Sequence, residues 1–323
     1  MKILWLEKSG EHTFGVPHAE HEFRHTVSKY AECAYAGEGY PDHRPGERLQ
    51  DTVKRVMPDA DWVIDAENAW DSPKPKKHRY RIGEFVHDIH GNHKYGLDNP
   101  VSTANKLNEA EYDSVFLRAP LIYGTSYRPN AFIDTLKCDK HWVPYSVDIG
   151  KYMVKTKRSI DVACIGATFA CYPLRREIAK DLYYVARGHK VFVNCGERDA
   201  VTRSEKGEKM LVGKEYDDTL LRTRILIFDC SIYRYPLFKF FEGMAAGCMC
   251  MSDAPYMADK LGLTHRVSYA EITLLNWDEA LQYYLDNPED VDRIAAQGRK
   301  IVKRQHNHDV RAKQLISILG RSP

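Results

Sequence analysis

Residues Arg234–Asp253 read RYPLFKFFEGMAAGCMCMSD, and this stretch decides the fold class of the chain. Its central part, Pro236–Ala246, has the pattern of a helix, and Gly247 follows as a residue that commonly ends helices. The next residues, Cys248–Met251, form a short apolar run typical of a buried strand. A helix that leads directly into a buried strand is typical of an α/β protein with a parallel sheet.

Lys239 and Glu242 stand three residues apart, on one face of the predicted helix. A carboxylate can accept two hydrogen bonds from the adjacent hydroxyls of a ribose, and a nearby Lys or Arg neutralises phosphate. The pair therefore suits a nucleotide-diphosphate ligand. The same residues fit the salt-bridged face of an ordinary core helix equally well, so both interpretations stay open at this point.

Strand-like runs alternate with helix-like stretches along the whole chain, and this alternation is typical of parallel sheets. In the second half the expected strands are Ile160–Ile165, the run HKVFVNCG at 189–196, Ile225–Phe228 and Cys248–Met251. In the first half they are Lys2–Leu6, Asp61–Ile64, Ile82–His87, Asp113–Leu117 and His141–Pro144, with a helix over Pro17–Ala36. We therefore predict an α/β protein with two Rossmann-like units in tandem.

The polar, basic stretch Lys151–Ser159 has no clear period and is the expected linker between the units. We predict an N-terminal domain at residues 1–150, a second domain at 151–305, and a terminal helix at 306–323 that packs back toward the N-terminal domain. The length of 323 residues is enough for two domains with an ordinary core in each.

The composition excludes several classes of protein. Lys and Arg number 47 against 45 Asp and Glu, with 43% hydrophobic residues, so the chain is neither a disordered tail nor a nucleic-acid-coating protein. No apolar run approaches the roughly 18 to 20 residues that span a bilayer, and Glu7 interrupts the apolar stretch that a leader would need. Eight cysteines without a CxxC pair are typical of reduced thiols, and we expect a cytoplasmic protein.

The second half of the chain is the better host for an anion. Residues 1–150 carry 19 Lys and Arg against 23 Asp and Glu, whereas the remaining residues carry 28 against 22. Gly166 follows an expected strand, so the loop after it can bring backbone amides and a helix start toward phosphate. Arg175 lies at the start of that helix, where a cation is unfavourable unless an anion lies nearby. A solvated helix face is the alternative.

The stretch FFEGMAAGCMCMSDAP at 240–255 resembles the E-A-M-A-x-G segment of the GT-B glycosyltransferases, in particular the retaining group-1 family and its spore-maturation-type branch. Three further segments agree in order, namely WVPYSVDI at 142–149, SIDVACIGATFACYPLRREIAKDL at 159–182 and HNHDVRAKQLI at 306–316. The resemblance covers about the last 180 residues. It implies two Rossmann-like domains with sheets facing across a cleft, and transfer of a sugar from a nucleotide-diphosphate sugar, expected to be a UDP-sugar, without a cofactor.

The resemblance also implies roles for individual residues. Glu242 stands where the family binds the donor ribose, and Gly166 and Arg175 match the start of its nucleotide domain. The family's second carboxylate falls eight residues before Glu242, where this chain has Arg234. Because of that departure, the resemblance does not identify the transferred sugar. Arg234 and Lys239 suggest a cationic clamp on the diphosphate, although an Arg stacked on the protein surface is the alternative.

In the first half, FVHDIHGNH at 85–93 resembles the V-x-H-D strand end of group-1 enzymes. Titratable side chains at the carboxyl end of a parallel strand lie where open α/β folds bind ligands. Asp88 or His90 could deprotonate an acceptor hydroxyl, and His87 could contact the donor sugar. A helix-capping aspartate and surface histidines are the alternative.

Two groups of histidines invite a metal interpretation. They are His18, His21 and His25 in one group and His87, His90 and His93 in the other. Neither comes with paired cysteines, Gly91 interrupts any helix through the second, and GT-B enzymes generally need no metal. We therefore predict no structural or catalytic metal.

The segment SPKPKKHRYR at 72–81 is a basic run in an acidic half of the chain. A solvated loop is one explanation. The other is a patch for a polyanionic acceptor such as DNA with a hydroxylated base, where Lys74, Lys76, Lys77 and Arg79 would follow phosphates.

Two rival functions use the same architecture. One is a nucleotide-sugar epimerase of double-Rossmann design. The other is a non-catalytic module that binds a sugar nucleotide, and Arg234 at the expected carboxylate position makes it credible. We predict a glycosyltransferase, specifically a hexosyl- or pentosyltransferase.

Overall fold

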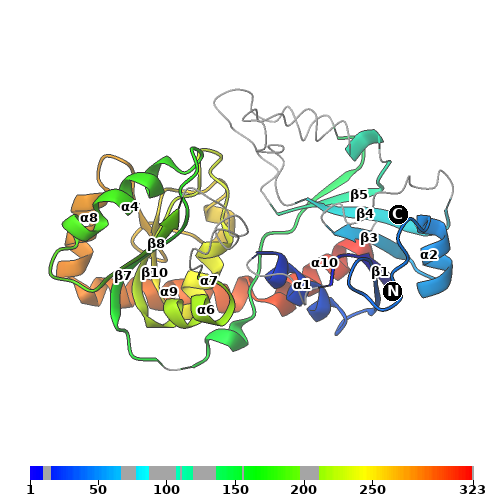
Figure 1. Cartoon of the computed structure of the whole chain (residues 1–323), viewed down its shortest axis with the longest axis horizontal. Coiled ribbons are helices and arrows are strands. Elements are labelled where there is room, and N and C mark those ends of the chain that lie inside the picture. Colours follow the sequence, from blue (N-terminus) through cyan, green and yellow to red (C-terminus); the bar gives the residue numbers. More distant parts are fainter. Residues whose placement is uncertain are drawn as a thin grey trace. The chain divides into compact units, whose positions relative to one another are not determined.

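The computed structural model describes residues 1–9, 16–66, 78–86, 107–109, 111–118, 136–154, 156–196 and 211–321. The chain divides into two compact units, each with its own sheet (Figure 1). Unit 1 consists of Met1–Pro144 together with His308–Pro323, and unit 2 of Tyr145–Asn307. In the described part of the chain, no helix has the length and apolar character needed to cross a membrane.

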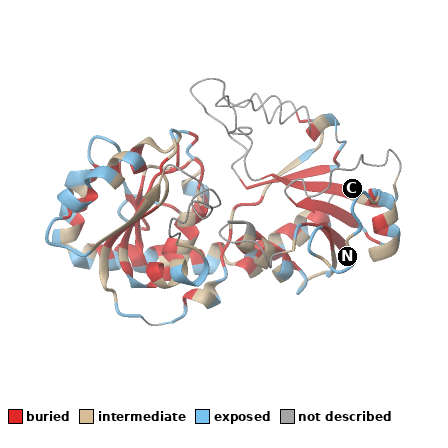
Figure 2. Cartoon of the chain, viewed as in Figure 1, coloured by how far each residue is buried: buried red, intermediate tan, exposed pale blue. Residues whose placement is uncertain are grey.

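Unit 1 is built on a parallel sheet of six strands in the order β2-β1-β3-β4-β5-β6. The strands are β1 (Lys2–Leu6), β2 (Glu32–Ala36), β3 (Trp62–Ala66), β4 (Arg81–Val86), β5 (Ser114–Leu117) and β6 (Asp139–Trp142). The helices are α1 (Val16–Val27), α2 (Leu49–Val56) and α10 (His308–Leu319). The apolar runs of β1 and β3 are buried on both faces, as parallel strands require, and appear as buried ribbons in Figure 2.

The helix expected over Pro17–Ala36 is shorter than predicted. It ends at Val27, a turn follows at Ser28–Tyr30, and Glu32–Ala36 forms the edge strand β2 beside β1. Cys33 and Tyr35, two residues apart on one face of the strand, pack against the core, whereas Glu32 at its start is exposed. The sequence predicts a continuous helix here because a five-residue strand directly after a helix is too short to show its own period.

Unit 2 has a parallel sheet of five strands in the order β11-β10-β9-β7-β8. The strands are β7 (Ile160–Ala167), β8 (Val191–Gly196), β9 (Thr223–Ile227), β10 (Met249–Ser252) and β11 (Ala270–Glu271). The helices are α4 (Pro173–Val185), α6 (Gly213–Arg222), α7 (Phe238–Ala246), α8 (Trp277–Asp286) and α9 (Pro288–Gln305), with short 3-10 turns η4 (Ile149–Tyr152) and η5 (Asp259–Leu261). The prediction of two Rossmann-like units with parallel sheets and C-terminal helices is confirmed.

Two details of unit 2 follow from single residues. Gly247 ends α7 in the left-handed conformation, with φ +80°, as its place after the helix predicted. The guanidinium of Arg158 donates to the carbonyls of Ala246 and Gly247 at 2.6 and 3.0 Å, which satisfies the last carbonyls of the helix. The end of α7 and the start of β10 are thereby fixed.

The last helix, α10, belongs to unit 1, where it packs against α1. Ala312, Leu315 and Leu319 of α10 join the core cluster that includes Phe23 of α1 and Trp5 of β1. The Trp62 indole donates a hydrogen bond of 3.3 Å to the carbonyl of Leu319. The C-terminal helix therefore completes the core of the N-terminal unit.

Candidate functional site

Gly166, near the end of β7, lies at the centre of the candidate donor site. Its φ of +128° is accessible to glycine and strained for other residues. A Cβ added here would lie 3.0 Å from Nη1 of Arg175 and 3.3 Å from Nζ of Lys239. The structure therefore brings three of the predicted donor-binding residues together, and the absence of a Cβ at Gly166 allows the side chains of Arg175 and Lys239 to approach its backbone.

Arg175, in the first turn of α4, is buried and engaged by the chain itself. Its guanidinium donates to the carbonyls of Ala167 and Asp229, at 2.9 and 3.0 Å, and forms an ion pair of 2.9 Å with Oδ1 of Asp229. The anion that the cation at this helix start requires is thus Asp229, which follows β9. Burial raises the pKa of Asp229 and Arg175 opposes that rise. Arg175 shapes the wall of the site and ties β7, α4 and β9 together.

Lys239 lies in the first turn of α7 and is partly buried. Within the described residues, no hydrogen bond or ion pair engages its ammonium group, which lies 5.9 Å from the centre of the Tyr216 ring. Burial lowers the pKa of Lys239, the positive charge of Arg175 acts in the same direction, and Glu242 opposes both. Lys239 is therefore a partly desolvated cation that an anionic ligand would stabilise.

Glu242 lies one turn further along α7 and is also partly buried. Its Oε2 accepts a hydrogen bond of 2.9 Å from the hydroxyl of Tyr216 in α6. Burial raises the pKa of Glu242 to about 7, whereas Lys239 and the Tyr216 bond act to lower it. Glu242 is a carboxylate held by a neighbouring helix rather than a solvated residue on a helix face. The role of Tyr216 could not be predicted, because nothing in the α6 sequence indicates which residue of α7 it faces.

Arg234 lies in the loop between β9 and α7 and has a left-handed backbone, with φ +52°. Its Nε donates to the carbonyl of Ala254 at 2.8 Å, and its guanidinium carbon lies 4.8 Å from the centre of the Tyr256 ring. The side chain is exposed. Arg234 therefore stacks on the surface beside the carboxyl end of β10, and its remaining N–H groups can still reach a ligand.

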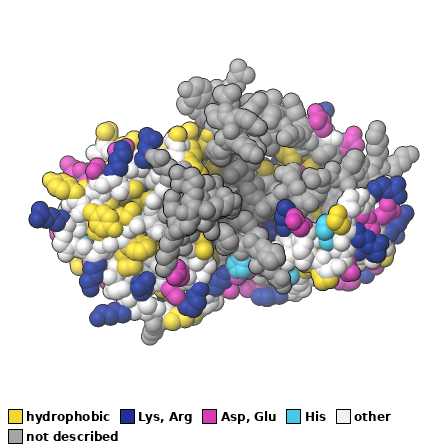
Figure 3. All heavy atoms as spheres, in the orientation of Figure 1, with side chains coloured by type: hydrophobic (Ala, Val, Ile, Leu, Met, Phe, Trp, Pro, Cys, Tyr) yellow, Lys and Arg dark blue, Asp and Glu magenta, His cyan; other side chains and the backbone are white. Residues whose placement is uncertain are grey.

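The predicted catalytic residues of the first half, His87, Asp88 and His90, lie outside the described residues, immediately after β4. Of the basic run, Lys74, Lys76 and Lys77 lie outside them too, and Arg79 is exposed. On the face shown in Figure 3, the described Lys and Arg side chains are interspersed with Asp and Glu.

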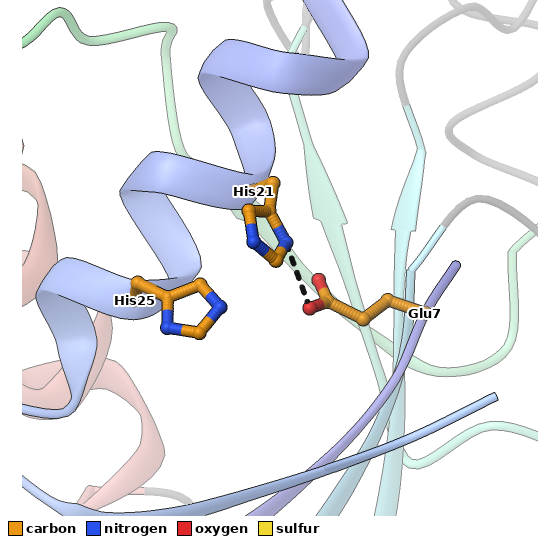
Figure 4. A group of neighbouring side chains, drawn as sticks. All are labelled: Glu7, His21 and His25. Atoms are coloured by element: carbon orange, nitrogen blue, oxygen red, sulfur yellow. Dashed lines mark hydrogen bonds and ion pairs between the residues drawn. The ribbon is translucent and has the colours of Figure 1, made fainter. Parts of the chain in front are cut away.

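A second group of side chains lies in unit 1, at the carboxyl end of β1. Ligand-type atoms of Glu7, His21 and His25 lie within 4.8 Å of one another (Figure 4). Burial alone would raise the pKa of Glu7, but His21, Arg24 and Tyr40 together hold it below its ordinary value. Burial and the neighbouring His21 lower the pKa of His25. The prediction of no metal site is made without regard to the residues between these two histidines, although residues 21–25, HEFRH, match the pattern H-E-x-x-H.

Residues 158–317 match the protein family described as glycosyl transferase-like (Glyco_trans_1_2). Nearly all of unit 2 is therefore similar to a glycosyltransferase domain. Its Gly166, Arg175, Lys239 and Glu242 all fall inside the matched range. A search of curated proteins gives no match for the chain.

Solved structures of glycosyltransferases share the fold over the whole chain. HepE of Anabaena in complex with UDP-glucose is 13% identical, with a TM-score of 0.68 over 99% of both chains. An alpha-glucosyltransferase in complex with UDP-glucose and DNA containing an abasic site is 13% identical, with a TM-score of 0.66 over 99% of both chains. Sucrose-phosphate synthase of Thermosynechococcus elongatus is 10% identical, with a TM-score of 0.66 over 99% of this chain and 98% of the other. The GT-B fold is confirmed.

Proposed function

We propose that this chain transfers a hexosyl or pentosyl group from a UDP-sugar to an acceptor hydroxyl, with retention of anomeric configuration. The observation that carries the proposal is the convergence of Gly166, Arg175 and Lys239, with Glu242 one turn further along α7. The first three residues lie at the carboxyl end of β7 and in the first turns of α4 and α7. Open α/β sheets bind ligands at this end of their strands.

Lys239 and the backbone at Gly166 are the proposed contacts for the donor diphosphate. Lys239 supplies a cation without a partner among the described residues, and the absence of a Cβ at Gly166 lets that cation lie close to the backbone at the end of β7. Arg175 adds positive potential although Asp229 balances its charge. Departure of the nucleoside diphosphate is the step that most needs stabilisation, and preorganised cations supply it.

Glu242 is the proposed contact for the donor ribose. Tyr216 occupies one side of Oε2, and a carboxylate has further lone pairs that can accept hydrogen bonds from two adjacent hydroxyls. The contact requires the ionised form. Glu242 therefore couples donor binding to pH, which an ordinary salt-bridged helix face would not do.

The identity of the transferred sugar depends in part on Arg234. A guanidinium in place of a carboxylate donates hydrogen bonds where the family accepts them, so the donor contact at this position differs in kind. The motifs at 142–149, 159–182 and 306–316 favour the spore-maturation-type branch of the family.

The acceptor is proposed to bind unit 1, with Asp88 as the group that takes its proton and His87 and His90 as the neighbouring candidates. DNA is one acceptor to test, because the basic run includes the exposed Arg79. Replacing Lys74, Lys76, Lys77 and Arg79 with Ser should weaken DNA affinity and flatten its salt dependence. If the unaltered protein does not bind DNA at low salt, DNA is excluded as the acceptor. A glycan, a protein or a small molecule is then the leading candidate.

Donor binding is tested with a panel of nucleotide sugars in a thermal-shift assay, with a metal chelator present. A bound donor raises the apparent stability by RT ln(1 + [L]/Kd), which is about 2.7 kcal/mol at a hundredfold excess over Kd. UDP-sugars should give the largest shift, and the chelator should not reduce it. The donor that binds is then incubated alone and with acceptor candidates. Isomerised donor without acceptor would indicate the epimerase, and binding without slow donor hydrolysis would indicate a non-catalytic module.

A further inference from the structure

The group formed by Glu7, His21 and His25 lies in unit 1 and has no part in the proposed donor site. His21 and His25 project from successive turns of α1 toward Glu7, which follows β1 (Figure 4). Nδ1 of His21 lies 3.0 Å from Oε1 of Glu7, and the ring centres of the two histidines lie 4.2 Å apart. Two imidazoles four residues apart on a helix, with one carboxylate opposite, form a donor set that Zn²⁺ prefers.

The spacing of the three donor atoms is close to that of a metal site. A tetrahedral Zn²⁺ with bonds of about 2.0 to 2.1 Å needs its donors about 3.3 Å apart. All three atoms lie within 4.8 Å of one another, and the His21–Glu7 pair is already at 3.0 Å. The ring centre of His25 lies 4.4 Å from that of Tyr35, on which it stacks. Because His25 is exposed, a rotation of its side chain away from Tyr35 can close the remaining gap.

Neighbouring residues hold the carboxylate in place. Arg24 forms a buried ion pair with Oε2 of Glu7, and the Tyr40 hydroxyl donates to Oε1. Hydrogen-bonded carboxylates of this kind are usual around metal ligands. The positive charge of Arg24 opposes a second cation, so the site should select a metal that imidazole binds strongly and reject Mg²⁺ and Ca²⁺.

The position of the group also indicates a ligand site. β1 lies between β2 and β3 in the sheet, so the strand order reverses beside it, and Glu7 stands at its carboxyl end. Open α/β sheets bind ligands at such a reversal. We propose that Glu7, His21 and His25 bind one Zn²⁺ with a fourth position open to water or a ligand. This departs from the expectation of a chain without metal, and it does not rest on sugar transfer.

The test uses Co²⁺ as a spectroscopic substitute for Zn²⁺ on the full chain after treatment with a chelator. We expect one Co²⁺ per chain with the visible absorption of a tetrahedral site, displaced by one equivalent of Zn²⁺ and unaffected by excess Mg²⁺. The chain has eight cysteines, which could also bind Co²⁺. The spectrum of the proposed site must therefore lack the charge-transfer band between thiolate and cobalt.

The decisive variant is His25→Asn, since His25 is exposed and its loss should leave the fold intact. Its Zn²⁺ affinity should fall by more than about 100-fold, which exceeds the usual effect of losing an outer contact. His18→Asn is the matched control, because His18 lies on the same helix but pairs with Glu22 at 3.3 Å. Absence of tetrahedral Co²⁺, a thiolate spectrum, or equal affinity in the two variants would overturn the proposal.

Discussion

The hydroxyl of Tyr216 lies 2.9 Å from Oε2 of Glu242 and joins α6 to α7 at the candidate donor site. The next residue of α6, Asp217, accepts a hydrogen bond of 2.6 Å from the hydroxyl of Tyr152. Two consecutive residues of α6 are therefore held, Tyr216 by Glu242 of α7 and Asp217 by Tyr152 of η4. Glu242 is held by a network within unit 2 before any ligand arrives.

Replacing Tyr216 with Phe should weaken donor binding through Glu242. The hydrogen bond from Tyr216 acts to lower the pKa of Glu242, so its loss leaves less carboxylate at neutral pH. We expect a Kd for the donor about three- to tenfold higher at pH 7, less than the 1.5 to 3 kcal/mol of a direct charged hydrogen bond. Titration calorimetry measures it, and the defect should shrink at pH 8.5. Tyr184→Phe, at an exposed position of α4, is the control. A defect of the same size at both pH values would contradict the explanation.

Donor affinity should depend on pH near neutrality. Since the pKa of Glu242 in the folded protein is about 7, only about a tenth of it is ionised at pH 6. A ribose contact that needs the carboxylate should therefore strengthen by roughly tenfold between pH 6 and pH 8. A UDP-sugar has no terminal phosphate to titrate in this range, so the dependence reports on the protein.

The Glu242→Gln variant supplies the control for that experiment, because glutamine keeps the shape and does not titrate. Its donor affinity should be flat from pH 6 to pH 8. The sign for stability is the opposite of that for binding: a raised carboxylate pKa destabilises the fold as pH rises from about 4.5 to about 7. A wild-type affinity that fails to rise with pH would show that ionised Glu242 makes no donor contact.

Substitutions of Arg175 and Lys239 should have different effects, the first on the stability of the fold and the second on donor binding. Arg175→Ala leaves Asp229 buried without its ion pair, so we expect a loss of about 3 to 5 kcal/mol in the free energy of unfolding. Lys239→Met removes a cation whose pKa burial already lowers, so the fold should keep its stability while donor affinity falls at least about tenfold. Chemical denaturation and donor titration measure the two effects. If both variants lost only stability, the diphosphate contact would be excluded.

Asp88→Asn should abolish most transfer while donor binding persists. A general acid or base contributes about 10²- to 10⁴-fold to rate, and asparagine keeps the size of the side chain. The readout is transfer to the identified acceptor alongside donor titration of the same preparation. Transfer at the unaltered rate would assign Asp88 a capping role and leave His87 and His90 as candidates.

The proximity of Gly166 and Lys239 could be predicted because it follows from chain order. Gly166 ends one strand, and Lys239 and Glu242 lie in a helix that leads into another, so parallel pairing brings them to one edge. The partners of these residues could not be predicted. Asp229 as the anion beside Arg175, and Tyr216 beside Glu242, depend on packing between elements that are distant in sequence.

Two further features could not be predicted from the sequence, namely the strand Glu32–Ala36 and the group around Glu7. The strand is short and follows a helix closely, so the sequence predicts a helix that continues across it. The histidines at 21 and 25 were visible, but the buried carboxylate that faces them comes from the end of β1. Only the packing of α1 on the sheet makes the three residues a group.

The most direct test of the proposed function is calorimetric titration of Glu242→Ala with the donor that the panel identifies. A carboxylate that accepts ribose hydrogen bonds, each contributing about 1.5 to 3 kcal/mol, predicts a donor affinity lower by roughly 10- to 150-fold. The variant should stay folded because Glu242 is only partly buried, and Glu279→Ala, at an exposed position of α8, should bind like the native protein. Unchanged donor affinity in folded Glu242→Ala would contradict the ribose contact on which the proposed donor site depends.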